Sequence, residues 1–344
     1  MLTLVLIVIL AALVFEFING FHDTANSIAT VVATKVLSPG WAVILAAGMN
    51  LLGALTGTAV AMTIASGLLN TDVVTVTPQV ILCALLGGIV WNLITWWKGL
   101  PSSSSHALIG GLCGAGLAAA HNNWGALIWS QNVGDWARNK GLLWKVFVPM
   151  ITSPIAGFLL GIAVMLLLWA IIAGMAALGG RIGRLARPRW IIAMTLVGAQ
   201  STGALDELPS WLAFLHPAAS AGQGIATWIV LTCAVVMAAG TASGGWKIIK
   251  TLGHKMVKLH PIHGFAAETS SATILTLAAH FGMPVSTTHS ISTAIMGVGF
   301  AKNPRSLRFG VIERIVWAWI LTIPAAAGVA YLIFRMFALF GWVG

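Results

Sequence analysis

Two short stretches decide the fold: Pro101-Ser-Ser-Ser-Ser-His106 and, 183 positions later, Pro284-Val-Ser-Thr-Thr-His289. Further short motifs align at the same offset: Gly114 and Gly116 with Gly297 and Gly299, and Gly57-Thr58-Ala59 with Gly240-Thr241-Ala242. Because one ungapped offset aligns all of them, the chain contains an internal repeat. We expect a first repeat over 1–180, a basic linker over 181–190 and a second repeat over 191–344.

The composition places both halves in a membrane. Hydrophobic residues make up 58% of the 344 positions and charged residues only 8%, which is too little charge to cover a soluble surface. The apolar stretches long enough to span a bilayer lie at about 2–19, 41–65, 78–97, 146–173, 225–245, 262–282 and 311–340. Two shorter stretches, near 105–120 and 289–301, each follow a proline and are expected to be half-helices buried in protein.

Repeats with proline-interrupted segments at matching positions are typical of secondary transporters, whose binding site lies where the halves meet. We therefore expect an all-α integral membrane protein of two inverted-topology repeats with broken helices and re-entrant hairpins. The net charge of +10 comes from clusters between apolar runs, such as 181–189 and 246–260, as in cytoplasmic loops. This pattern predicts a lipid bilayer as partner and no nucleic acid.

The two repeated stretches also carry chemistry. Proline ends one helix, and the hydroxyl run after it begins the next, where free N–H groups and a partial positive charge favour anions. Two such starts facing each other would form an uncharged, donor-rich cradle for a tetrahedral oxyanion. The alternative is that Ser103 and Ser286 only cap their helices. His106 and His289 could donate to the anion, relay protons or simply pack.

A third polar motif, Asn19-Gly-Phe-His-Asp-Thr-Ala-Asn-Ser27, interrupts the first apolar stretch. We expect Gly20 to permit a helix break, with His22, Asp23 and Asn26 at membrane depth, where ionisable groups are usually functional. Asp23 and Asn26 share a helix face and suit a hard cation such as sodium, or a proton. The alternative is a turn between two short helices.

Glu16 and Glu268 are the other acidic residues inside apolar segments. A membrane carboxylate that takes up a proton can couple transport to a proton gradient. A buried pair with Lys98 or with a histidine is an equally good interpretation of Glu268.

At these residues the sequence resembles the inorganic phosphate transporter family in its bacterial form, over nearly the whole chain. The matching motifs are Gly20–Val32, Leu100–His106, Gly244–Gly253, His263–Glu268 and Met283–His289. The resemblance implies phosphate uptake, alone or as a metal–phosphate complex, by cation symport with alternating access in a bacterial-type cytoplasmic membrane. It favours a proton over sodium as the coupling cation.

The resemblance also implies the site residues. The substrate would be bound by one hydroxyl run from each half and by one amide: Ser103, Ser104, Ser105, Ser286, Thr287, Thr288 and Asn26. Asp23, Asn26, His22 and Glu268 would bind the coupling cation, and His106 and His289 remain candidates for a proton relay. We expect no cofactor, no structural metal and no enzymatic activity; a homo-oligomer is compatible with the sequence.

The second half departs from this family pattern. It lacks a counterpart of Gly20–Ser27, because the basic linker ends at Trp190 and Ile191–Ala199 already resembles Ile28–Val36. Either the natural protein carries about 25–35 further residues here, which we favour because both flanks keep the family pattern, or the segment is deleted.

Three other functions remain as alternatives. A sulfate or other oxyanion permease and an anion channel could both use the same cradle. A membrane enzyme using Ser102 and His106 is disfavoured, because no Gly-x-Ser-x-Gly elbow, His-Glu-x-x-His motif or P-loop accompanies them.

Overall fold

The computed structural model describes residues 2–56, 67–131, 141–177, 227–280 and 285–342. Every helix or turn of helix named below lies in these ranges. The α-helices are α1 (Leu2–Ala33), α2 (Pro39–Thr56), α4 (Pro78–Lys98), α5 (Ser104–Ala119), α6 (Val148–Ala177), α8 (Thr227–Ser243), α9 (Trp246–Lys250), α10 (Pro261–His280), α11 (Thr287–Lys302) and α12 (Phe309–Leu339). Shorter turns are η1 (Trp124–Ala126) and η7 (Pro304–Ser306), both 3₁₀, and η3 (Leu143–Phe147) and η6 (Thr251–Lys255), both π-helical. The described part of the chain is therefore all-helical, as predicted.

Several of these helices are suited to a bilayer. Among the described residues, four helical stretches are long and apolar enough to cross a membrane: Leu2–Ala33, Pro78–Lys98, Leu143–Ala173 and Phe309–Leu339. Large apolar side chains such as Ile155, Leu159 and Leu167 of α6 lie on the outside of the bundle, where lipid would cover them. Because α10 carries the polar run that begins at Glu268, it is not one of the four, although it is 20 residues long.

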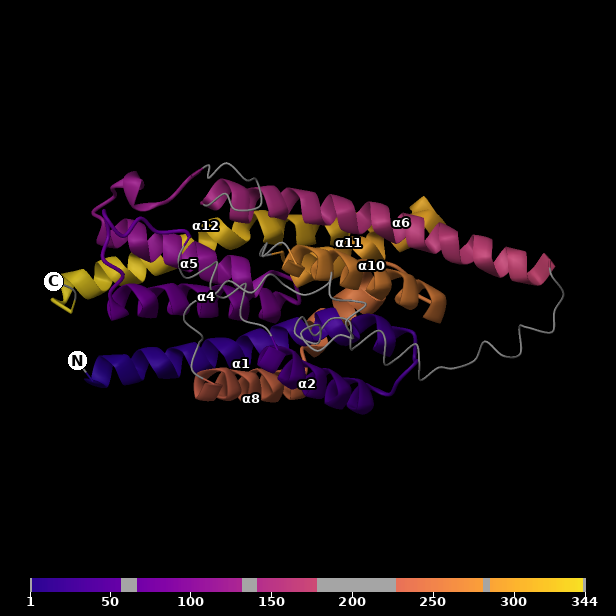
Figure 1. The fold of residues 1–344 in the computed structure, drawn as a ribbon, viewed down its shortest axis with the longest axis horizontal. Helices are drawn as coiled ribbons and strands as arrows, with labels where there is room; N and C mark the ends of the chain where they lie inside the picture. Colours follow the sequence, from indigo (N-terminus) through magenta and orange to yellow (C-terminus); the bar gives the residue numbers. More distant parts are fainter. Residues whose placement is uncertain (1, 57–66, 132–140, 178–226, 281–284, 343–344) are drawn as a thin grey trace.

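The short helices α5 and α11 are central to the arrangement. Helix α5 packs against α4 and α12, whereas α11 packs against α10 and α6. In Figure 1, α5 lies nearer the end of the bundle that carries both termini, and α11 lies nearer its middle. A Cβ added at Gly114 of α5 would overlap the Ala327 carbonyl of α12, and one at Gly297 of α11 would overlap the Phe158 carbonyl of α6. The two glycines aligned by the sequence offset therefore perform the same task, which is to let a neighbouring helix approach closely.

The helix break expected at Gly20 is wrong, because α1 is one continuous helix from Leu2 to Ala33. Gly20 is needed instead for a close crossing with α8. A Cβ at Gly20 would overlap the Met237 carbonyl of α8, and a Cβ at Gly240 would overlap the Phe17 carbonyl of α1. The polar motif therefore lies on an intact helix that is pressed against its neighbour.

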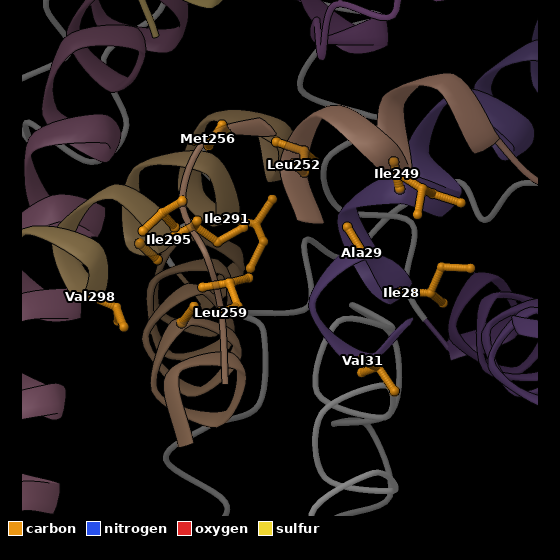
Figure 2. Close-up of a cluster of buried hydrophobic side chains, with 14 of the residues drawn as sticks. Ile28, Ala29, Val31, Ile249, Leu252, Met256, Leu259, Ile291, Ile295 and Val298 are labelled. Carbon is orange, nitrogen blue, oxygen red and sulfur yellow. The ribbon is translucent and has the colours of Figure 1, made fainter. Parts of the chain in front are cut away.

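The segment 246–260 is not the open loop that its lysines suggested. It forms α9 and η6, which pack against α1, and its apolar residues Ile249, Leu252 and Met256 are buried. Figure 2 shows these side chains in one cluster with Ile28 of α1 and Ile291 of α11. Lys250, Lys255 and Lys258 remain exposed, so the charges line the outer face of a packed segment.

Three sequence-based predictions fall outside the described residues. They concern the basic linker over 181–190, the junction between Trp190 and Ile191, and the motif at Gly57–Ala59.

Candidate functional site

The first residues of α5 and α11 have the same local structure. Ser103 precedes α5, and its Oγ accepts a hydrogen bond from the His106 backbone N–H at 3.3 Å. Ser286 precedes α11 and accepts in the same way from the His289 N–H at 3.2 Å. Capping is therefore confirmed for both serines. It does not exclude a role in binding, because a hydroxyl that accepts one bond can still donate its own proton.

The two helix starts lie next to each other. The rings of His106 and His289 meet edge to face with their centroids 5.1 Å apart. The Thr288 hydroxyl of α11 donates to the Ser102 carbonyl just before α5, at 3.1 Å. The N-terminal ends of two helices, each with free N–H groups and a partial positive charge, thus converge on one place.

The polar motif of α1 reaches the same place. The Asn26 amide Nδ2 lies 2.8 Å from Thr288 Oγ1, 3.2 Å from Thr287 Oγ1 and 3.1 Å from Asp23 Oδ1. Asn26 is 3% exposed, so these bonds form away from bulk solvent. Asn26 therefore bonds the hydroxyls after Pro284 directly, whereas Asp23 is linked to them through Asn26, and the helix that carries both is unbroken.

The carboxylate of Glu268, on α10, contacts α1 one helical turn after Asn26. Thr30, four residues after Asn26, donates to Glu268 Oε1 of α10 at 2.5 Å, and both side chains are buried. Residues four apart share a helix face, so Asn26 and Thr30 place the helix starts and Glu268 on the same side of α1. Lys98, the other partner considered for Glu268, is exposed, with its ammonium 5.6 Å from the Trp97 ring centroid.

His22 faces a different neighbour. Its Nε2 lies 3.1 Å from the Thr95 hydroxyl of α4. Its Nδ1 is 3.8 Å from Asp23 Oδ1, which is too long for a hydrogen bond. His22 therefore bonds α4, and neither of its ring nitrogens bonds a described residue of the two helix starts.

Several buried polar atoms beside the helix starts have no hydrogen-bond partner among the described residues. They are Ser104 Oγ, Ser292 Oγ, His106 Nδ1 and both ring nitrogens of His289. Buried polar groups are nearly always bonded, so such a concentration is unusual. A polar ligand at the helix starts would find these atoms without a bond to the protein.

The predicted hydroxyls do not all share this environment. Ser103, Ser104, Ser286 and Thr288 are buried, Thr287 is half-buried, and Ser105 is exposed. Four residues in these contacts were not expected from the sequence: Trp91, Trp319 and Thr322, which bond residues 101–102, and Thr30, which bonds Glu268. Only Thr30 had a usable signal, its spacing of four from Asn26. Nothing in the sequence near Trp91, Trp319 or Thr322 indicates that they reach residues 101–102.

Two helix starts that meet inside a bundle with apolar outer faces define a helical membrane protein with a polar interior site. Known proteins agree with this class. The model of the phosphate transporter family matches residues 19–215 and 191–330, and the chain belongs to that family.

Two curated relatives are both named as phosphate transporters. A "Probable low-affinity inorganic phosphate transporter" of Mycobacterium bovis is 41% identical over 332 residues, covering 94% of this chain and 75% of that protein. A Bacillus subtilis protein of the same name is 39% identical over 344 residues and is covered to 98%, as is this chain. A solved structure, "The sodium-dependent phosphate transporter", shares the fold with a TM-score of 0.70 at 21% identity, covering 98% of this chain and 99% of that one.

Proposed function

We propose that this protein is a secondary active transporter that takes up inorganic phosphate by cation-coupled symport. The observation that carries the proposal is the set of bonds from Asn26 of α1 to Thr287 and Thr288 at the start of α11. These bonds bring the polar motif of the first half to the donor-rich helix start of the second. The names of the curated relatives support phosphate as the substrate.

In this proposal the oxyanion is bound by Ser103 and Ser104 from one helix start and by Ser286, Thr287 and Thr288 from the other. Hydroxyls and backbone N–H groups stabilise an anion without a fixed positive charge, so the bound anion can still leave. The halves are inverted repeats, and alternating access arises when one half moves against the other around this site.

The coupling cation is bound near Asp23 of α1, beside Asn26, and near Glu268 of α10, which bonds Thr30 of α1. We propose a proton rather than sodium, and phosphate carried alone or as a metal–phosphate complex. Either cation adds positive charge beside the anion site, so cation and anion stabilise each other's binding. His106 and His289, adjacent at the helix starts, are candidates for a proton relay.

Uptake of labelled phosphate into proteoliposomes tests the proposal. The protein is reconstituted with an imposed pH gradient, a sodium gradient or neither, and unlabelled sulfate is added as a competitor. Asp23→Asn removes the carboxylate at the candidate site. Asp72→Asn is the matched control, because Asp72 is exposed in a loop.

Accumulation driven by one gradient, lost in Asp23→Asn and retained in Asp72→Asn, supports the proposal and names the cation. Flux that follows the phosphate gradient with no dependence on either cation indicates a channel. Strong inhibition by sulfate indicates a broader oxyanion permease. Absence of any uptake by folded protein contradicts the proposal.

We propose further that the second half is complete without the roughly 25–35 residues expected between Trp190 and Ile191, because the alignment with the Bacillus subtilis relative spans 344 positions and covers 98% of each chain. The intact mass of the natural protein, compared with the 36.0 kDa of this sequence, tests this. An equal mass supports it, and a mass larger by a helix and its motif contradicts it.

A further inference from the structure

The four serines after Pro101 differ in which protons they can offer. The Thr322 hydroxyl of α12 donates to the Ala318 carbonyl at 2.6 Å, which uses its only proton. The 2.8 Å bond between Ser102 Oγ and Thr322 Oγ1 must then be donated by Ser102. The proton of Ser102 is therefore committed to α12, whereas Ser104 Oγ has no partner among the described residues.

The side chain of Trp91, on α4, bonds both Ser102 and Thr322. Its indole N–H lies 3.1 Å from Thr322 Oγ1 and 3.2 Å from Ser102 Oγ, so it donates to both oxygens. Ser102 and Thr322 are buried, and each of their oxygens has a donor. The Ser102 side chain thus fastens the segment before α5 to α4 and α12, and its proton is not available to a substrate.

Trp319, one turn before Thr322 on α12, contacts both helix starts. Its indole N–H donates to the Pro101 carbonyl at 3.0 Å. Its ring lies against the His289 imidazole of α11, with centroids 4.2 Å apart and planes inclined by 38°. One buried side chain therefore holds the segment before α5 by a directional bond and supports the first turn of α11 by ring contact.

Among the described residues, this set of bonds is found at the start of α5 and not at the start of α11. At the offset of 183 positions, Ser102 corresponds to Val285, which has no hydroxyl to donate. The start of α11 is instead joined to Asn26 of α1. The bond that Ser102 donates is thus not a consequence of the repeat.

We propose that Trp319 and Thr322 are positioning residues for the phosphate site: they hold the start of α5 at the spacing from the start of α11 that the anion requires. This inference rests on the proposed function. Donors stabilise a charged ligand best when they are fixed before it binds, because no reorganisation is then needed. Loosening α5 therefore weakens phosphate binding more than it slows the transport of bound phosphate.

Trp319→Phe tests the directional bond, because the variant keeps an aromatic ring against His289 and loses the N–H. We expect the KM for phosphate uptake to rise about tenfold, or ~1.4 kcal/mol, with the maximum rate per folded protein changed less than about twofold. Trp317→Phe is the matched control, since Trp317 lies on the same helix with 55% of its surface exposed. Its KM should be unchanged.

Thr322 provides a second test that does not depend on an aromatic residue. Thr322→Val is close to isosteric but cannot accept from Ser102 and Trp91, and should raise the KM in the same direction. Thr322→Ser restores the hydroxyl and should restore the KM. Phosphate-induced thermal stabilisation of the detergent-solubilised protein should weaken in parallel in Trp319→Phe and Thr322→Val.

A general structural role would instead lower the yield of folded protein and its maximum rate while the KM stayed constant. An unchanged KM in both Trp319→Phe and Thr322→Val, with normal uptake by the unsubstituted protein, overturns the positioning role alone. Absence of phosphate uptake and of phosphate-induced stabilisation in the unsubstituted protein contradicts the proposed function, and this inference with it.

Discussion

The starts of α5 and α11 have the same backbone and different attachments. Both helices are 16 residues long and are preceded by a serine that caps the histidine three positions on. The segment before α5 is fastened to α12 through Pro101 and Ser102, whereas α11 is joined to the polar motif of α1 through Thr287 and Thr288. The repeated sequence determines the local structure of each helix start. What each start is attached to depends on single differences within the repeat, such as Ser102 against Val285, and on residues elsewhere in the chain.

The exposure of equivalent side chains also differs between the two starts. Ser104 is buried and its counterpart Thr287 is half-buried, but Ser105 is exposed and its counterpart Thr288 is buried. The neighbours explain this difference, because Asn26 and the Ser102 carbonyl both bond the Thr288 hydroxyl. The two half-sites therefore present different hydroxyls, even though their sequences align without a gap.

The largest effect is expected at Asn26, which joins α1 to the start of α11. Asn26→Ala removes the amide that bonds Asp23, Thr287 and Thr288, and leaves buried hydroxyls without their donor. We expect phosphate uptake at low concentration to fall about 100-fold, since losing buried hydrogen bonds of this kind costs ~2–3 kcal/mol. Initial rates in proteoliposomes measure it.

Asn50→Ala is the comparison for this variant. Asn50 also donates to a threonine, Thr241 of α8 at 2.8 Å, but it bonds α8 rather than a helix start. It should lower thermal stability and leave the KM for phosphate unchanged. Equal loss of uptake in the two variants would show that Asn26 acts through stability alone.

The next largest effect is expected on stability, at the glycines that α5 and α11 have in common. It tests whether these glycines are equally important in both helices. Gly114→Ala and Gly297→Ala each place a methyl group against a backbone carbonyl of a neighbouring helix, Ala327 or Phe158. We expect each to destabilise the protein by about 2 kcal/mol, because overpacking of a close contact costs roughly 1–3 kcal/mol. Thermal unfolding in detergent measures it.

Gly328→Ala on α12 is the control, since nothing lies within 4 Å of a Cβ added there. It should be neutral or slightly stabilising, because alanine favours a helix more than glycine does. If only one of Gly114→Ala and Gly297→Ala destabilises the protein, the two helices do not pack equivalently.

A smaller effect compares one donor from each start. Ser104→Ala and Thr287→Val remove hydroxyls that correspond at the offset of 183 positions. We expect each to raise the KM for phosphate about tenfold, since a hydrogen bond to a charged ligand contributes roughly 1.5–3 kcal/mol. A rise in only one variant would mean that a single half-site holds the anion and the other serves as framework.

The sequence contained enough information to predict the helical class, the short helices and the serine caps. These features depend on local signals: apolar length, proline and a hydroxyl three residues before the capped N–H. A bond between Asn26 and another polar segment could also be expected, because polar side chains inside a membrane usually pair with one another.

The rest depends on contacts between distant segments. Gly20 in a polar motif suggested a helix break, but the same residue also suits a close helix crossing, and only the position of Gly240 on α8 decides between them. The lysines of 246–260 indicated a loop, whereas Ile249 and Leu252 between them are buried against α1. Trp319 and Thr322 looked like ordinary residues of an apolar helix, since their partners lie more than 200 positions earlier.

The smallest effect is expected at Ser105, whose hydroxyl the family resemblance places at the substrate and the structure places on an exposed surface. Ser105→Ala should change the KM for phosphate less than about twofold, as exposed substitutions usually cost under ~0.5 kcal/mol. Its counterpart Thr288→Val should raise the KM much more, because Thr288 bonds both Asn26 and the Ser102 carbonyl. Uptake kinetics of the two variants, measured side by side, decide whether equivalent positions have become unequal. A loss in Ser105→Ala as large as that in Ser104→Ala would show that the outer face of the α5 start also contacts the anion during transport. In that case the difference in exposure describes one conformation of the transport cycle and not the division of labour between the half-sites.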